Sequence, residues 1–481
     1  MCCLPSRSRA RAATVVAALS LALAAGIGAQ ARPVSGIDRF AGTWRGEMGE
    51  GTPIAMRVVL VVRRDSSGTV GAVLAPPAML RAAPAMPVTL VGDTLVGADA
   101  SGAQLRAVIA SGGDSLRLLL RTSTATVPLM LARSDTILAG PSRPQTPVAP
   151  FPYATRTVTI PYGRGDSLQG TLTLGMGGAR RTPAVLLIAG GDTRDRDGTL
   201  FEHRPLAVLA DHLARSGIAA LRVDRVASAC GQWPDDTAAR VAEARAALAW
   251  LRTQPEVASA RVGIVAHAEG AVVAALVAKS RRDVAALALL APTALRGDTL
   301  VAAQAERSMR AVMPVGVELG EMDPVAMTAE FIYAVASGRD STDAIRRLDS
   351  VATAMGSRSG EPMAGMIAQA LTPYRALAKP AMLARLRFDP LPTYQGVTTP
   401  VLVIGAEADL QCAVPACAKR VGDALARGGA GEVQVVTIQS LNHQLQLART
   451  NTPFEPMELT ETISPFVLGP LTGFLREKLR P

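Results

Sequence analysis

Aromatic residues are scarce in this sequence: they make up 3% of its 481 residues, whereas hydrophobic residues as a group make up 49%. Any core must therefore be packed mainly from small aliphatic side chains. Charged residues amount to only 19%, a composition that excludes intrinsic disorder for most of the chain. The length leaves room for two or three domains with sizeable buried cores.

Lysine is also rare, because only four of the 50 basic residues are lysines: Lys279, Lys379, Lys419 and Lys478. The formal net charge of +10 comes from scattered arginines, without the clustering and interleaved aromatics of a nucleic-acid surface. The four histidines show no spacing that resembles a zinc site, and no phosphate-binding loop motif is present. We therefore expect no nucleic-acid partner, no metal and no cofactor.

Long apolar runs are missing as well. The apolar stretch at residues 12–28 is shorter than the ~20 residues that a membrane-spanning helix needs. Arg7, Arg9 and Arg11 precede it, and an A-x-A pattern ending at Ala31 follows it, so residues 1–31 are typical of a secretory signal peptide. We expect cleavage near Ala31, export to the periplasm or the medium, and no membrane span.

Cysteine is limited to five residues, of which Cys2 and Cys3 lie in the signal segment. In an oxidising compartment, one pair among Cys230, Cys412 and Cys417 can form a disulfide. The sequence alone does not choose the pair, although Cys412 and Cys417 are the local candidates.

Residues 36–135 have the pattern of a small all-β domain, in which short β-branched runs alternate with turn residues. Gly92 and Asp93 form a two-residue hairpin signal. Strands are expected within residues 42–46, 54–63, 69–75, 88–91, 94–96, 105–109, 116–120 and 127–131. The segment around Trp44 resembles the opening strand of lipocalin-like barrels, and an ordinary core tryptophan beside a turn is the alternative interpretation.

A proline-rich stretch within residues 136–152 predicts an extended linker. From residue 153 to 481, strands alternate with amphipathic helices, which indicates an α/β domain with a mostly parallel sheet. Strands are expected at 184–188, 218–223, 262–265, 284–290 and 401–404, and helices at 205–215 and 237–252.

Residues 297–387 read as a helical insertion that would cap the carboxyl edge of this sheet. It is rich in methionine, at positions 309, 313, 322, 327, 355, 363 and 366. These side chains could line an adaptable apolar pocket, but plain core packing is the more common role.

The segment from Arg261 to Ala271 has the strand, sharp turn and helix of a nucleophile elbow, whose pattern is G-x-S-x-G. It resembles the Gly-His-Ser-Glu-Gly-Gly motif of exported bacterial esterase-like α/β-hydrolases, which often carry a β-domain in front. Residues 187–191 resemble the oxyanion loop of that family, and 441–443 its histidine loop. The resemblance implies an α/β-hydrolase fold with a helical cap and activity on carboxylic esters.

The family order of nucleophile, acid and base maps the acid onto Asp409 and the base onto His443. Asp409 directly follows the strand at 401–404, where a carboxylate can hold the tautomer of an incoming imidazole. The resemblance also makes Gly191, Asp192 and Glu269 the candidates for the oxyanion-hole positions.

Ala268 occupies the nucleophile position, and a methyl group cannot attack a carbonyl. Asp192 replaces a glycine of the family loop and places a carboxylate where negative charge would develop. The loop at 224–230 is one residue shorter than its family counterpart and lacks its glycines. We therefore expect a catalytically silent pseudoenzyme that binds an acyl, ester or peptide-like ligand, or a partner.

Two active alternatives remain open. In the first, Asp409 and His443 activate water directly as a general base, which would give a weak ester hydrolase. In the second, Ser228 or Cys230 acts as a displaced nucleophile. The sequence identifies neither the ligand nor the oligomeric state.

Overall fold

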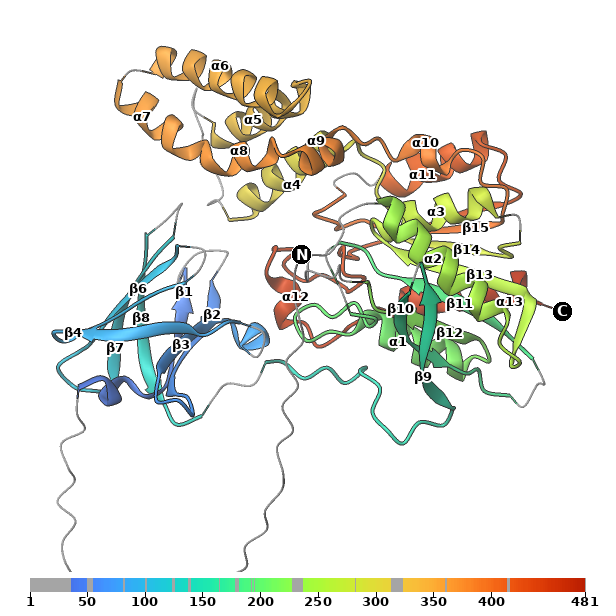
Figure 1. Ribbon diagram of the computed structural model, residues 1–481, viewed down its shortest axis with the longest axis horizontal. Helices are drawn as coiled ribbons and strands as arrows, with labels where there is room; N and C mark the ends of the chain where they lie inside the picture. The colour runs from blue at the N-terminus through green and yellow to red at the C-terminus, as the bar shows by residue number, and fades with distance from the viewer. Residues whose placement is uncertain are drawn as a thin grey trace, which may run out of the picture.

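The computed structural model describes residues 36–480, except for 50–54, 81–82, 100–101, 123–125, 137–139, 164, 178–180, 192, 194, 227–236, 282, 313–322, 360 and 413–415. The predicted signal peptide therefore lies outside the described residues, as do Asp192, Ser228 and Cys230. The described part of the chain forms a β-barrel, a mixed α/β unit and a helical cap (Figure 1).

The first unit is a closed barrel of antiparallel strands in sequential order, in which β8 pairs back with β1. After a 3-10 helix, Gly36–Phe40, the strands are β1 (Gly42–Met48), β2 (Met56–Arg64), β3 (Val70–Ala75), β4 (Met86–Val91), β5 (Thr94–Ala98), β6 (Gln104–Ile109), β7 (Ser115–Arg121) and β8 (Thr126–Ser134), with a further 3-10 turn at Pro77–Met79. Phe40 and Trp44 are fully buried in its interior, and the Trp44 indole donates a hydrogen bond to the Phe40 carbonyl (2.8 Å). The expectation of an all-β region is confirmed, and its interior is a packed core.

The α/β unit is built on a sheet with the strand order β16-β15-β14-β13-β11-β12-β10-β9. Its strands are β9 (Thr155–Tyr162), β10 (Asp166–Thr173), β11 (Thr182–Ile188), β12 (Ala219–Val223), β13 (Val257–His267), β14 (Leu287–Leu290), β15 (Val401–Ala406) and β16 (Val433–Ile438). Strands β11 to β16 are parallel, whereas β10 runs antiparallel to β9 and β12.

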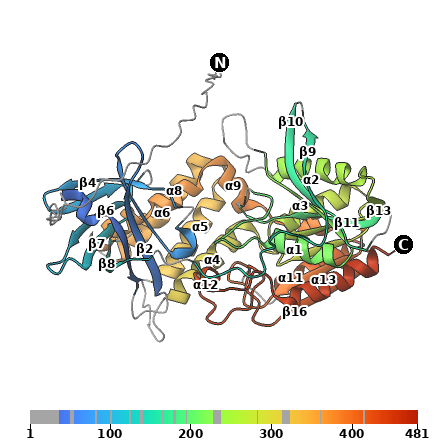
Figure 2. The same cartoon turned by 90° about the horizontal axis from the view of Figure 1, so that it is seen from below.

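Helices cover both faces of this sheet because its central strands are apolar on both sides. In β11, Ala184 and Leu186 pack into one core, and Val185 and Leu187 pack into the other. The first core is covered by α2 (Thr237–Arg252), α3 (Gly270–Ser280), α10 (Leu391–Tyr394) and α11 (Ala416–Arg427), and the second by α1 (Pro205–Arg215) and α13 (Pro465–Lys478). Figure 2 shows helices of both sets packed around the strands of the sheet. A mixed α/β fold is confirmed.

The edges of the sheet differ from the prediction. Strands β9, β10 and β16 were not expected, because many of their side chains are exposed and their sequences lack a continuous apolar run. By contrast, α1 and α2 have the bounds predicted from their apolar periodicity.

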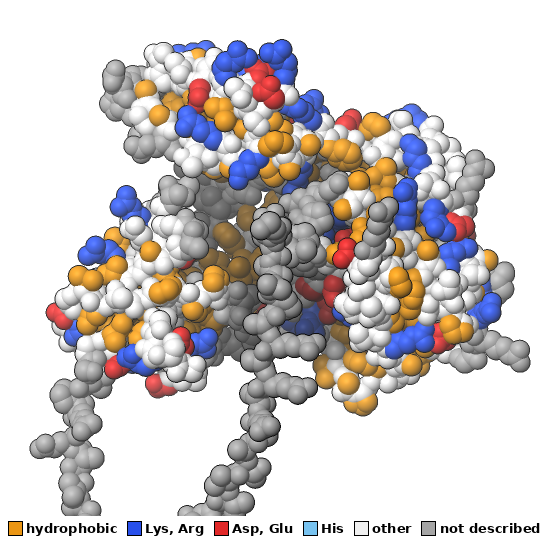
Figure 3. Space-filling model, viewed as in Figure 1, with side chains coloured by type: hydrophobic (Ala, Val, Ile, Leu, Met, Phe, Trp, Pro, Cys, Tyr) orange, Lys and Arg blue, Asp and Glu red, His pale blue; other side chains and the backbone are white. Residues whose placement is uncertain are grey.

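The cap lies between β14 and β15 (Figure 1), and its described residues form the helices α4 (Gly297–Val312), α5 (Pro324–Ser337), α6 (Ser341–Ser359), α7 (Glu361–Ala370), α8 (Thr372–Leu377) and α9 (Pro380–Arg387). They enclose a core of their own, against which Met327 and Met355 pack. These two methionines therefore serve as core packing. Basic side chains stand out on the outer surface of the cap (Figure 3). Within the cap, Arg339, Arg346 and Arg347 form ion pairs with Asp343.

The segment between the barrel and the α/β unit has no helix or strand in its described residues, but it is fastened to the α/β unit. The Arg143 guanidinium donates hydrogen bonds to the carbonyls of Met457 (2.8 Å) and Leu459 (2.5 Å). Arg57 on the barrel forms an ion pair with Glu458 in the short helix α12 (Glu455–Glu458). The linker is therefore held against the α/β unit along part of its length.

Candidate functional site

The turn between β13 and α3 has the geometry of a nucleophile elbow. Ala268 occupies it with φ of +51°, a left-handed conformation that is rare for residues other than glycine. The turn lies so close to the loop after β11 that a Cβ on Gly190 would be 2.5 Å from the Ala268 Cβ. A Cβ on Gly270 would likewise be 2.7 Å from the Ala189 carbonyl oxygen. Glycine at both positions thus permits the close approach, and Ala268 lines the pocket described below.

Asp409 and His443 are brought together by two loops on the same edge of the sheet. His443 Nδ1 lies 2.8 Å from Asp409 Oδ2, and the two side chains are 13% and 3% exposed. Because the Asp409 carboxylate accepts a hydrogen bond from Nδ1–H of His443, a neutral imidazole in this position has an unprotonated Nε2. This pair has the geometry of a general base with its orienting acid.

The carboxylate of Asp409 is held in its charged form by several donors. Burial alone would raise the pKa of Asp409, but the charge and hydrogen bond of His443 act against this. The backbone amides of Gln411 and Cys412 also donate to Oδ1, at 2.7 and 2.8 Å. The net result is a pKa below the usual value of an aspartate, so Asp409 is ionised at neutral pH.

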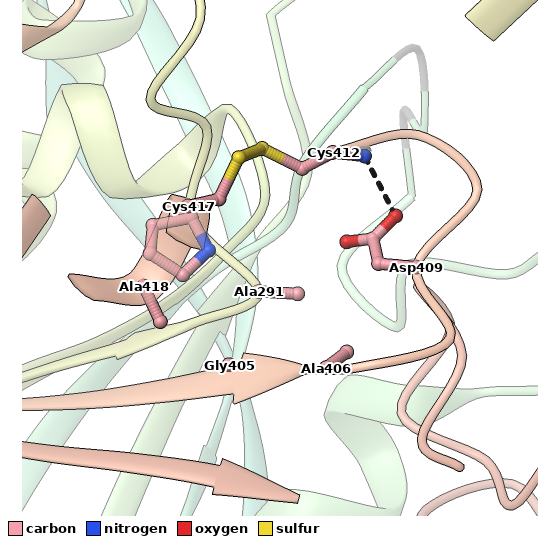
Figure 4. A pocket seen from close by; sticks show the side chains of 8 residues that line it. Ala291, Gly405, Ala406, Asp409, Cys412, Cys417 and Ala418 are labelled. Atoms are coloured by element: carbon pink, nitrogen blue, oxygen red, sulfur yellow. Dashed lines mark hydrogen bonds between the residues drawn. A yellow bond between two sulfur atoms is a disulfide. The ribbon is translucent and has the colours of Figure 1, made fainter. Parts of the chain in front are cut away.

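A disulfide between Cys412 and Cys417 closes the loop that carries these amides (Figure 4). The local pairing is thus observed, and Cys412 contributes both a sulfur to the bridge and an amide to Asp409. The cavity beside it measures only about 10 Å³, which is about the least that a single water molecule needs. It is therefore too small to be a substrate site.

His267, the residue before Ala268, supports the loop that carries His443. Its Nε2 donates to the backbone carbonyl of His443 (2.8 Å), and the two rings lie 5.0 Å apart. Burial, reinforced by the nearby His443, lowers the pKa of His267 to about 4. A neutral His267 with its proton on Nε2 therefore fixes the position of the His443 backbone.

The remainder of the histidine loop is fixed by buried polar groups. The Asn442 side chain bonds to both the amide and the side chain of Gln446, and Gln446 donates in turn to the Glu461 carbonyl (2.7 Å). His203 contacts the Thr462 hydroxyl (2.9 Å), and burial lowers its pKa to about 4. His203 is thus a structural histidine.

The candidate oxyanion loop packs against the elbow. The Gly190 carbonyl accepts a hydrogen bond from the Thr193 hydroxyl (2.8 Å), so the amide of Gly191 in the same trans peptide points the opposite way. A Cβ on Gly190 would be 3.3 Å from the Glu269 amide nitrogen. Gly191 and Glu269 both line the pocket described next, whereas Asp192 lies outside the described residues.

A pocket of about 1020 Å³ lies between the elbow, the oxyanion loop, the histidine loop and cap helices α4 and α9. Ala268 and His443 are both part of its wall. Its size is at the upper end of the range for small-molecule sites. The cap is tied to the site, since Arg385 pairs with Glu269 (2.5 Å) and Arg307 donates to the Asp409 carbonyl (3.0 Å).

The sequence analysis did not identify the charged residues of this pocket. Arg225, Arg240 and Arg385 line it, but they come from the end of β12, from α2 and from α9, and no local spacing connects them. Met382 also lines it, although the methionines singled out in the cap did not include it. Among the described residues, no three His, Cys, Asp or Glu side chains come together as a metal site, and none of the described helices is long and apolar enough to cross a membrane.

Comparison with known proteins gives structural similarity only. No protein-family model matches the chain, and a search of curated protein sequences finds no match. An esterase from Pyrobaculum calidifontis is 19% identical over 68% of this chain and 86% of its own, with a TM-score of 0.40. A thermostable carboxylesterase cloned from a metagenomic library is 17% identical over 70% and 91%, also with a TM-score of 0.40. One of two fungal esterases from Rhizomucor miehei is 14% identical over 68% and 85%, with the same TM-score.

Proposed function

We propose that this protein is a catalytically silent member of the esterase-like α/β-hydrolases that binds a small acyl, ester or peptide-like ligand in the pocket under its cap. One observation carries the proposal. Ala268 stands at the apex of a closely packed elbow, at φ +51°, beside an aligned Asp409–His443 pair. The site retains a base and a pocket but has no nucleophile at the elbow.

A second candidate function is a weak ester hydrolase without a covalent intermediate. The observation in its favour is the 2.8 Å bond between His443 and Asp409, which leaves Nε2 of His443 able to deprotonate a water in the pocket. Replacing the serine side chain with a methyl group would leave space for that water beside the base.

Hydrolysis of p-nitrophenyl acetate by the wild-type protein and by His443→Ala separates the two functions. If the protein is catalytically silent, we expect both proteins to hydrolyse the ester at the same rate, equal to that of buffer alone. A wild-type rate that falls ~10²-fold or more in His443→Ala would support the hydrolase and contradict the silent fold. The matched control is His212→Ala, because His212 lies on α1, does not line the pocket, and uses its ring Nε2 in a hydrogen bond with the Thr472 hydroxyl (2.8 Å).

We also propose that the protein acts after export. The basic and apolar pattern of residues 1–31 supports this. The Cys412–Cys417 disulfide supports it as well, since disulfides persist in oxidising compartments.

A further inference from the structure

The charged wall of the pocket is predominantly basic. Its described charged residues, apart from the histidines, are Arg225, Arg240, Arg385 and Glu269. Glu269 is already engaged by Arg385. Among the described residues, the pocket thus holds more positive than negative charge, although nothing in an ester or amide substrate demands a cation there.

Arg240 is the most informative of these residues. Among the described residues, its guanidinium makes one hydrogen bond, to the carbonyl of Ala189 (2.7 Å), which is a neutral acceptor. Burial and the neighbouring Arg225 lower the pKa of Arg240, and the carboxylates of Glu269 and Glu243 offset this only in part. Arg240 is half-buried. Partial removal of a cation from water without full compensation is costly, and a bound anion would compensate it.

The position of Arg240 places this charge next to the reaction centre of the parent fold. Ala189, which Arg240 contacts, precedes Gly190, and a Cβ on Gly190 would be 2.5 Å from the Ala268 Cβ. The cap and the segment after it also contribute apolar side chains to the pocket, among them Leu300, Met382 and Phe388. The wall of the pocket therefore combines cationic with apolar side chains.

We propose that the pocket binds an amphiphilic carboxylate, with its carboxylate on Arg240 beside Ala268 and its hydrocarbon chain under the cap. This inference rests on the proposed function as a ligand-binding site. A guanidinium presents paired N–H donors that match the two oxygens of a carboxylate. In this arrangement, the protein holds the acid that an ester hydrolase would release as its product.

The test is isothermal titration calorimetry of the purified protein with octanoate and with octanamide, which has the same chain without the charge. We expect octanoate to bind at least ~10-fold more tightly than octanamide. Arg240→Met should reduce the affinity for octanoate ~10-fold and leave that for octanamide unchanged. Arg385→Met gives a second variant, which should also weaken octanoate because it leaves the Glu269 carboxylate uncompensated. Arg245→Met is the matched control, since Arg245 lies exposed on the same helix as Arg240 and bonds to Ser280.

The outcomes distinguish a failure of the carboxylate assignment from a failure of the proposed ligand-binding function on which it rests. Equal affinities for the two probes, or unchanged octanoate binding in a folded Arg240→Met, would overturn the carboxylate assignment and leave the binding function standing. If neither probe binds the wild-type protein, both the carboxylate assignment and the proposed acyl-ligand pocket are wrong. Melting temperatures of the variants within a few degrees of the wild type establish that each variant is folded.

Discussion

Ala268→Ser should convert the protein into an esterase, with a rate on p-nitrophenyl acetate at least ~10²-fold above that of the wild type. The elbow already holds position 268 at φ +51°, and the serine hydroxyl would enter the same pocket as His443. His443 is bonded to an ionised Asp409, so its Nε2 is available to accept the serine proton. Stopped-flow or plate-reader kinetics of p-nitrophenol release measure the gain.

Two double variants control this experiment. Ala268→Ser combined with His443→Ala should return to the wild-type rate, and Ala268→Ser combined with Asp409→Asn should lose most of the gain, because the tautomer of His443 is no longer fixed. If folded Ala268→Ser shows no rate above the wild type, the remaining groups do not form a working hydrolase site. The interpretation of this site as a hydrolase site without its nucleophile would then fail.

Gly190→Ala should destabilise the α/β unit by about 2 kcal/mol, through overpacking against the elbow. The added Cβ would lie 2.5 Å from the Ala268 Cβ and 2.7 Å from the His267 carbonyl oxygen. The second neighbour is backbone and cannot move without displacing the elbow. Urea unfolding followed by far-UV circular dichroism measures the loss as a lower midpoint.

Gly473→Ala provides the same substitution with the opposite expected effect on the free energy of unfolding. Gly473 lies exposed inside α13, and a Cβ there meets no atom within 4 Å, so alanine should stabilise the helix by ~0.5–1 kcal/mol. A Gly190→Ala midpoint equal to that of the wild type would mean that the elbow is not packed as described.

The sequence predicted the parts of the fold that local patterns determine. The apolar periodicity of α1 and α2 and the strand-turn-helix around Ala268 are local, so their places in the chain could be read directly. The polar, half-exposed edge strands β9 and β16 could not, because their pairing depends on neighbours far along the chain.

The same distinction applies to the site. Asp409 and His443 were found through the order and context of a family motif, and the structure places them 2.8 Å apart. The bond from His267 to the His443 carbonyl and the ion pair between Arg385 and Glu269 join residues more than a hundred positions apart. No sequence spacing marks such contacts, and the basic wall of the pocket is visible only once the chain is folded.

The most direct test of the central claim is the reaction of the wild-type protein with a fluorophosphonate, which forms a covalent bond with a serine that an adjacent histidine activates. Intact-protein mass spectrometry should find the wild type unmodified and Ala268→Ser labelled once per chain, at residue 268. Stoichiometric labelling of the wild type that disappears in His443→Ala would contradict the account. If that label mapped to the segment 227–236, the nucleophile would be displaced and the protein would be an active hydrolase.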